Sequence, residues 1–144
     1  MFLRWQSHGD GPEAHPGSCI YNLNSMYSAR LLDHFQNPRN VGDIPGADAS
    51  AEMENPACGD VLRLSLKISS GRIADIRFKA KGCVPSMACA SALTELVSGK
   101  AVEEARMLSR DSLIAAVGGL PQASTHAAQL ALDALSAALS RVQP

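Results

Sequence analysis

The sequence predicts an α+β domain in which a small antiparallel sheet of three strands packs against about five helices. Two segments with alternating apolar residues, joined by a turn, indicate the sheet, and the chain after residue 83 is helical with breaks. A chain of 144 residues, 46% of them apolar, is large enough to bury one hydrophobic core. We therefore expect one domain over residues 26–144.

Residues 1–25 are expected to form a disordered extension. Glycines and prolines break every period there, and polar residues fill the gaps. His8, His15 and Cys19 lie in this segment, so the alternative is a weak metal-binding tract. Met26 is a second candidate for the true start residue.

The strand pair is predicted between residues 62 and 80. In its first half Leu62, Leu64 and Leu66 alternate with polar residues, and residues 76–80 repeat the pattern. Residues 69–71, Ser-Ser-Gly, form the turn between them. Each strand has one polar face, which is typical of an antiparallel sheet covered by helices on one side. Residues 51–56 are a weaker candidate for a third strand.

Five helical segments flank the sheet. The first begins near Tyr27 and ends at Asn37-Pro38, because a proline disfavours helical geometry in the residue before it. The second follows residue 83 and has an apolar stripe, and two short helices cover residues 102–108 and 112–117. The last helix begins near residue 125 with apolar residues at positions i, i+3, i+4 and i+7, and Ser124 or Thr125 is expected to cap it.

Composition excludes several classes of function. Thirteen basic and fourteen acidic residues leave a formal charge of -1, so no basic field favours nucleic acid as a partner. No apolar run approaches the roughly 18 residues of a membrane span, and the N-terminus lacks the apolar core of a signal peptide. We therefore expect a cytoplasmic protein with no membrane partner, whose four cysteines are free thiols or metal ligands.

A thiol and a carboxylate lie two residues apart at Cys58-Gly59-Asp60, immediately before a predicted strand. Gly59 allows a bend that would turn both side chains toward one point. A soft and a hard ligand together suit zinc or iron. The alternative is a turn that contains a cysteine by chance.

Cys83 and His126 are the other candidate ligands. Cys83 lies between a strand end and a helix start, where the helix dipole would favour its thiolate; the alternative is a buried structural thiol. His126 falls in the first turn of the last helix, which favours the neutral imidazole that a metal needs, although an exposed histidine would give the same pattern. Cys89 lies on an apolar stripe and is assigned to the core. His34 is assigned a surface or half-buried packing position without chemistry.

No motif for hydrolysis or phosphate binding is present, so the sequence does not predict an enzyme and no residue is expected to be catalytic.

Taken together, the motifs resemble the NifU/IscU-type iron–sulfur cluster assembly scaffolds. The resemblance runs from Met26 to the C-terminus, with the motifs in family order. It is carried by Tyr27-Ser28, Leu32-Asp33-His34-Phe35, Asn37-Pro38-Arg39-Asn40-Val41-Gly42, Pro56-Ala57-Cys58-Gly59-Asp60, Lys79-Ala80-Lys81-Gly82-Cys83, Thr94-Glu95-Leu96-Val97 and Gly99-Lys100.

The resemblance implies a scaffold that assembles a labile [2Fe–2S] cluster, often carries zinc at the same site, and can dimerise. Its implied partners are a cysteine desulfurase, which supplies sulfur, and apo iron–sulfur target proteins, which receive the cluster. The implied ligands of the cluster or metal are Cys58, Asp60, Cys83 and His126.

Two positions depart from the family pattern. The family's third essential cysteine, a ligand and the usual sulfur acceptor, is Ala127 here, and the Leu-Pro-Pro-Val-Lys segment that a chaperone recognises is replaced by residues 120–124, Leu-Pro-Gln-Ala-Ser. Two alternatives therefore stay open. One is a zinc-bound sulfur carrier that activates a desulfurase, and the other is a divergent paralogue that no longer assembles clusters.

Overall fold

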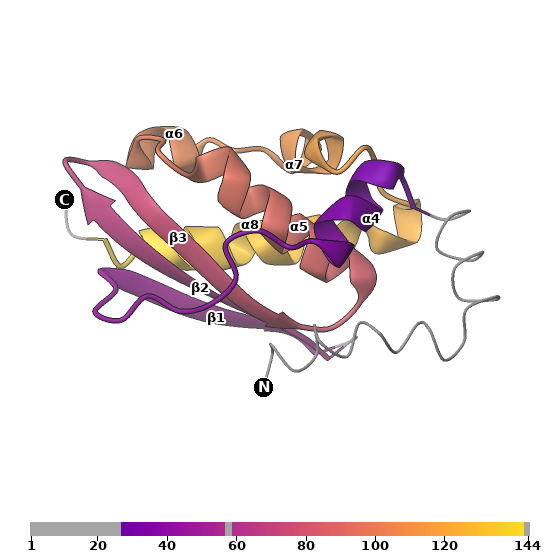
Figure 1. The fold of residues 1–144 in the computed structure, drawn as a ribbon, viewed down its shortest axis with the longest axis horizontal. Coiled ribbons are helices and arrows are strands. Elements are labelled where there is room, and N and C mark those ends of the chain that lie inside the picture. The colour runs from indigo at the N-terminus through magenta and orange to yellow at the C-terminus, as the bar shows by residue number, and fades with distance from the viewer. Residues whose placement is uncertain (1–26, 57–58, 143–144) are drawn as a thin grey trace.

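The computed structural model describes residues 27–56 and 59–142. The expected N-terminal extension, residues 1–25, lies outside them. Within these residues three strands and five α-helices follow one another in the chain (Figure 1). They are α4 (Ala29–Gln36), β1 (Ala49–Asn55), β2 (Asp60–Ser69), β3 (Arg72–Lys81), α5 (Val84–Val97), α6 (Val102–Arg106), α7 (Arg110–Ala116), the 3-10 turn η2 (Gln122–Ser124) and α8 (Thr125–Leu139).

The three strands form one antiparallel sheet in the order β1-β2-β3. Ser70 and Gly71 connect β2 to β3 with φ angles of 52° and 76°, the backbone that two-residue hairpin turns require. The sequence prediction of the sheet and of its turn is confirmed. The third strand begins at Ala49, two residues before the predicted segment.

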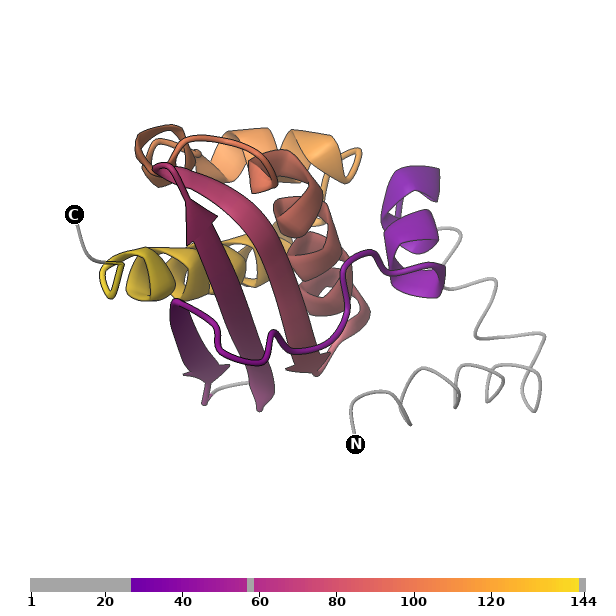
Figure 2. The same ribbon diagram turned by 60° about the vertical axis from the view of Figure 1, so that its left-hand side comes forward.

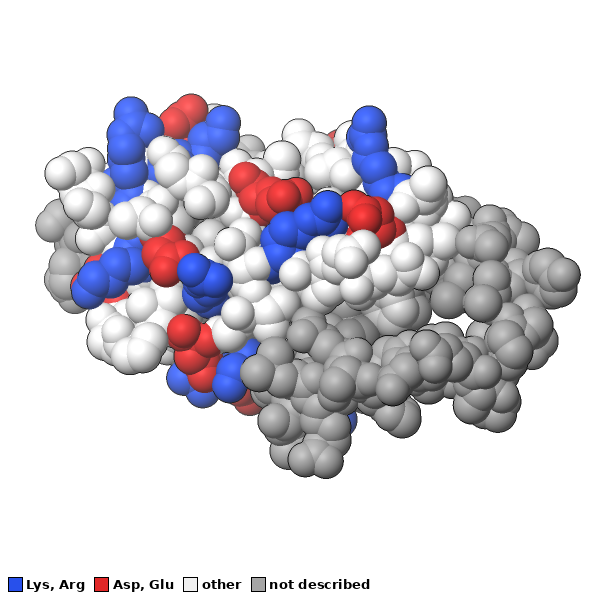
Figure 3. All heavy atoms as spheres, in the orientation of Figure 1, with Lys and Arg blue, Asp and Glu red and all other residues white. Residues whose placement is uncertain are grey.

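Helices cover one face of the sheet. Leu62, Leu64, Ile76 and Phe78 are buried on that face, under α5 and α8. The other face carries the polar residues of β2 and β3, as the alternating pattern predicts. The charged side chains of both signs are intermixed on the molecular face seen in Figure 3.

The segment between α4 and β1 crosses the face of the sheet opposite α8 (Figure 2). It first pairs with the outer edge of β3, where the Phe78 N–H donates to the Asn40 carbonyl at 2.9 Å and the Gly42 N–H to the Phe78 carbonyl at 2.8 Å. The Asp43 carboxylate then lies 3.0 Å from Lys79 Nζ and 3.7 Å from Arg63 Nε. This crossing anchors α4 to the sheet.

Helix α5 is the centre of the domain. The sequence predicts an apolar stripe along it, but every residue from Pro85 to Thr94 is buried, so this part of the helix is enclosed on all sides. It packs against α4, α7, α8 and β3. Small side chains such as Ala88, Ala90 and Ser91 allow these neighbours to pack closely around the helix.

His34 is more deeply buried than the sequence predicts. It is 7% exposed; its Nδ1 lies 2.8 Å from Ser91 Oγ and its Nε2 3.6 Å from Glu95 Oε1. Burial lowers the pKa of the imidazole, and the nearby Arg39 lowers it further, while Glu95 and Asp33 oppose both effects. His34 is therefore a neutral core residue that joins α4 to α5.

The start of α8 also differs from the prediction. Ser124 makes no capping hydrogen bond, and the Thr125 hydroxyl donates to the Gln122 carbonyl at 3.1 Å. The 3-10 turn η2 leads directly into α8 and replaces a side-chain cap. The apolar stripe of α8 is buried as expected. None of the described helices has the length and hydropathy needed to cross a membrane.

Truncation of the core of α5 tests this packing. Leu93 is fully buried, so Leu93→Ala should lower the free energy of unfolding by about 2–5 kcal/mol. Met107 is 82% exposed, so Met107→Ala should change the free energy of unfolding by no more than about 0.5 kcal/mol. Urea unfolding followed by circular dichroism measures both, and equal effects would contradict the central position of α5.

The burial of His34 predicts a dependence of stability on pH. Its pKa in the folded state lies below the ordinary value of 6.5, so the native state disfavours the protonated ring. The stability it provides is complete above pH 6.5 and is lost as the pH falls below that value toward the folded-state pKa. The stability advantage of the unsubstituted protein over His34→Gln should therefore shrink between pH 7.5 and 5 in urea titrations. A constant or growing difference would contradict this assignment.

Candidate metal site

Three of the four predicted ligands meet at one end of the sheet. Asp60 is the first residue of β2, Cys83 follows β3 and precedes α5, and His126 is the second residue of α8. Val61 pairs with Lys81, so the start of β2 lies beside the end of β3. The ligand atoms of Asp60, Cys83 and His126 all lie within 4.8 Å of one another.

Their spacing is close to that of a metal site. Asp60 Oδ2 is 3.2 Å from Cys83 Sγ and 3.9 Å from His126 Nε2. Tetrahedral zinc with ordinary bond lengths holds neighbouring ligand atoms about 3.3–3.8 Å apart. A thiol, a carboxylate and an imidazole are all donors that zinc and iron accept, so the three residues fit such an ion with small movements.

The Asp60 carboxylate is 2% exposed and held by neutral donors. The Cys83 N–H donates to Oδ1 at 3.0 Å, and the Ser86 hydroxyl donates to Oδ2 at 2.7 Å. Across the described part of the chain no lysine or arginine forms an ion pair with it, and the nearest basic group is His126. A buried carboxylate is costly without a positive partner, and a metal cation would supply one.

Cys83 lies at the N-cap of α5, as the sequence predicts, but its thiolate is not favoured in this state. Burial is the largest effect and raises the pKa of the Cys83 thiol, and the Asp60 carboxylate raises it further. The hydroxyl and backbone N–H of Ser86 act in the opposite direction. The predicted influence of the helix start is therefore outweighed, and a bound metal must displace the thiol proton.

The ring of His126 is oriented by the backbone. Its Nδ1 lies 3.2 Å from the Ala123 carbonyl oxygen, which can only accept, so the neutral ring carries its proton on Nδ1. The lone pair is then on Nε2, the atom that faces Asp60. A carbonyl that fixes the tautomer in this way is typical of metal-binding histidines.

Two glycines shape the Asp60 side of the site. Gly59 has φ 75°, a left-handed backbone that agrees with the bend predicted there. Gly82 has φ 155°, and a Cβ on it would lie 2.2 Å from Asp60 Oδ1. The absence of a side chain at Gly82 thus makes room for the Asp60 carboxylate.

The remaining cysteines have different outcomes. Cys58 lies outside the described residues, so its role as a fourth ligand stays a prediction. Cys89 is fully buried in the core, as predicted, and burial raises the pKa of its thiol to about 12. Ala127, where the resemblance implies a thiol, is 1% exposed and belongs to the hydrophobic core.

Ser86 is the residue of this cluster that sequence reasoning missed. A serine in the third position of a helix has no pattern that distinguishes it from other polar residues, and only the fold brings it to Asp60.

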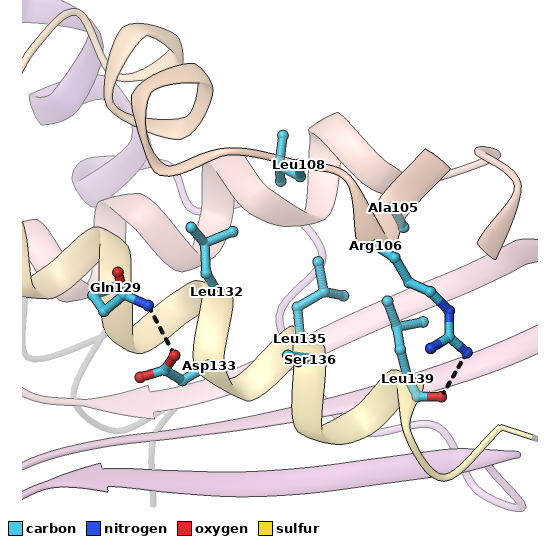
Figure 4. A pocket seen from close by; sticks show the side chains of 9 residues that line it. All are labelled: Ala105, Arg106, Leu108, Gln129, Leu132, Asp133, Leu135, Ser136 and Leu139. Carbon is cyan, nitrogen blue, oxygen red and sulfur yellow. Dashed lines mark hydrogen bonds between the residues drawn. The ribbon is translucent and has the colours of Figure 1, made fainter. Parts of the chain in front are cut away.

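A groove along α8 is separate from the cluster. It is lined by α8 residues from Gln129 to Leu139 together with Ala105, Arg106 and Leu108 (Figure 4). Its lining contains no cysteine and no histidine, and it includes none of the three ligands. The candidate metal site is therefore the cluster and not this groove.

Comparisons with known proteins agree with the motifs. The family model described as the NifU-like N terminal domain matches residues 26–143. The iron-sulfur cluster assembly scaffold protein IscU 1 of Archaeoglobus fulgidus is 46% identical over 114 residues, which are 79% of this chain and 74% of that protein. The scaffold protein IscU of Aquifex aeolicus is 39% identical over 115 residues, covering 78% and 73% of the two chains.

A solved structure supports the fold. The N-terminal NifU-like protein of Brucella abortus superposes with a TM-score of 0.71 over 83% of this chain and 96% of that chain, at 19% identity. The sequence match covers most of the domain and the folds agree, so this chain belongs to the family of the NifU-like N-terminal domain.

Proposed function

We propose that this protein is a non-enzymatic scaffold or carrier for iron–sulfur cluster assembly. The observation that carries the proposal is the convergence of Asp60, Cys83 and His126 within 4.8 Å in a chain whose relatives are named as such scaffolds. The proposed ligand set is Cys58, Asp60, Cys83 and His126, and the cargo is a transient [2Fe–2S] cluster or a single iron or zinc ion.

The donor set suits a cargo that is held and then released. Two thiolates and an imidazole bind iron and zinc firmly, and histidine can replace cysteine on an iron–sulfur cluster. The harder carboxylate of Asp60 is a weaker partner for a cluster iron than a third thiolate would be. A mixed set of this kind favours transfer over permanent storage.

Access to the site agrees with this role. Cys83 is partly exposed, and the side chain of His126 is 36% exposed. Sulfur from a cysteine desulfurase could reach the site from this side, and an apo target protein could accept the cluster there. Because Cys89 is buried and residue 127 is alanine, sulfur acceptance falls in our proposal to Cys83 or Cys58.

Anaerobic reconstitution tests the function. Iron and sulfide added to the protein should give visible absorption, and Cys83→Ala and Cys58→Ala should abolish it because each removes a thiolate ligand. Cys89→Ala is the control, because it removes a thiol that is buried in α5 and lies outside the ligand cluster, and it should leave the absorption intact. If the unsubstituted protein binds neither a cluster nor a stoichiometric metal ion, the proposal fails.

Substitution of Gly82 tests the role of Asp60. Gly82→Ala places a methyl group on the Asp60 carboxylate and should weaken zinc binding in a competition titration with a chromophoric chelator. Gly99→Ala is the control, because Gly99 also has a positive φ of 80° but a Cβ there meets nothing within 4 Å. Both variants should lose some stability from backbone strain, and only the first should lose affinity. Equal zinc affinities would argue against Asp60 as a ligand.

A further inference from the structure

Ser86 connects two of the proposed ligands. It is the third residue of α5 and is 5% exposed. Its Oγ lies 2.7 Å from Asp60 Oδ2 and 3.2 Å from Cys83 Sγ. These contacts place a buried hydroxyl against a carboxylate and a thiol at once, although Ser86 is not itself in the ligand set.

The direction of these hydrogen bonds follows from the groups involved. A serine hydroxyl has one proton to donate, and an ionised carboxylate can only accept. The Ser86 proton therefore goes to Asp60 Oδ2, at the short distance of 2.7 Å that a charge-assisted bond favours. The Cys83 thiol also donates to Oδ2, at 3.2 Å.

The backbone places the side chain of Ser86 near that of Cys83. Ser86 lies three residues after Cys83, so both side chains are on one face of the first turn of α5. Pro85 between them restricts the backbone of this turn. The Cβ of Ser86 is thus held in place relative to Cys83, and the hydrogen bond to Asp60 Oδ2 sets the direction of the hydroxyl.

Both oxygens of Asp60 are oriented by this turn. Oδ1 accepts from the Cys83 N–H, and Oδ2 accepts from Ser86 and faces Cys83 Sγ and His126 Nε2. Without the hydroxyl, nothing else among the described side chains, apart from the thiol that a metal would take, donates to Oδ2. The carboxylate would then be held through Oδ1 alone, and the direction of Oδ2 would be less tightly fixed.

We propose that Ser86 is a positioning residue of the metal site, whose hydroxyl holds Asp60 Oδ2 in the direction of Cys83 and His126. This inference rests on the proposed function, because it takes Asp60 and Cys83 as ligands. Hydrogen bonds to ligands commonly change metal affinity by a factor of about 10–100, and hydrogen bonds to a cluster's sulfur ligands tune its properties.

The test compares hydroxyl removal at two places on α5. Ser86→Ala should lower the zinc affinity by a factor of about 10–100 in competition with a chromophoric chelator. Ser91→Ala is the matched control: Ser91 is also buried on α5, but its hydroxyl contacts His34 and the Arg39 N–H and lies outside the ligand cluster. This control should lose stability and keep the zinc affinity of the unsubstituted protein.

A second readout separates positioning from a purely structural role. With Co²⁺ in place of zinc, the sulfur-to-cobalt charge-transfer band should shift in Ser86→Ala and stay unchanged in Ser91→Ala. This band comes only from molecules in which a thiolate binds the metal, and circular dichroism of the same samples checks that they are folded. Ser86→Thr keeps the hydroxyl and should restore both the band and most of the affinity.

The outcomes are distinct. If Ser86→Ala binds zinc as tightly as the unsubstituted protein, or more tightly, the positioning role is wrong while the proposed function stands. An equal loss in Ser91→Ala would likewise overturn it, since the effect would then come from the helix as a whole. If the unsubstituted protein binds neither Zn²⁺ nor Co²⁺, the metal site and this inference both fail.

Discussion

The buried Asp60 carboxylate is the group on which the arrangement of this end of the molecule depends. Its Oδ1 accepts from the Cys83 N–H, so it ties the first residue of β2 to the start of α5. Its Oδ2 accepts hydrogen bonds from the Ser86 hydroxyl and the Cys83 thiol and lies 3.9 Å from Nε2 of His126. A carboxylate that is 2% exposed needs such partners, because burial of an unpaired charge is costly. The same group thus joins a strand to a helix and forms the centre of the proposed metal site.

The connections between the layers of the fold bring Cys83 and His126, two of the proposed ligands, to Asp60. The antiparallel hairpin places the end of β3 beside the start of β2. Only Gly82 and Cys83 separate β3 from α5, and Gly82 gives the space that the carboxylate needs. Helix α8 packs on the face of the sheet that α5 also covers, and it starts near Asp60, which brings His126 into the cluster. The enclosed helix α5 holds this geometry in place, because its buried residues contact the sheet, α4, α7 and α8. The site is therefore built on rigid elements, with the thiol and the imidazole left partly open to solvent.

The sequence predicts the strands and helices in which apolar residues recur with a regular period. Alternation over β2 and β3 indicated the sheet, and the 3.6-residue period indicated α8, because in both cases one face is buried and the other is wet. From Pro85 to Thr94 helix α5 has no exposed face, so its small buried residues give no such signal. The burial of His34 against it was missed for the same reason. The ligand set came from the family resemblance. The structure brings together Asp60, Cys83 and His126, while Ser86 belongs to no motif and becomes visible only through its contacts.

The alanine at position 127 increases the importance of the residues that orient Asp60. Ala127 comes directly after His126 and is buried in the core of α8, so this chain has a methyl group where the family pattern has a thiol. A site with fewer thiolates depends more strongly on its hard ligand, because the carboxylate must then supply a larger share of the binding. The residues that orient that carboxylate, Gly82 by leaving space and Ser86 by donating a hydrogen bond, become correspondingly more important.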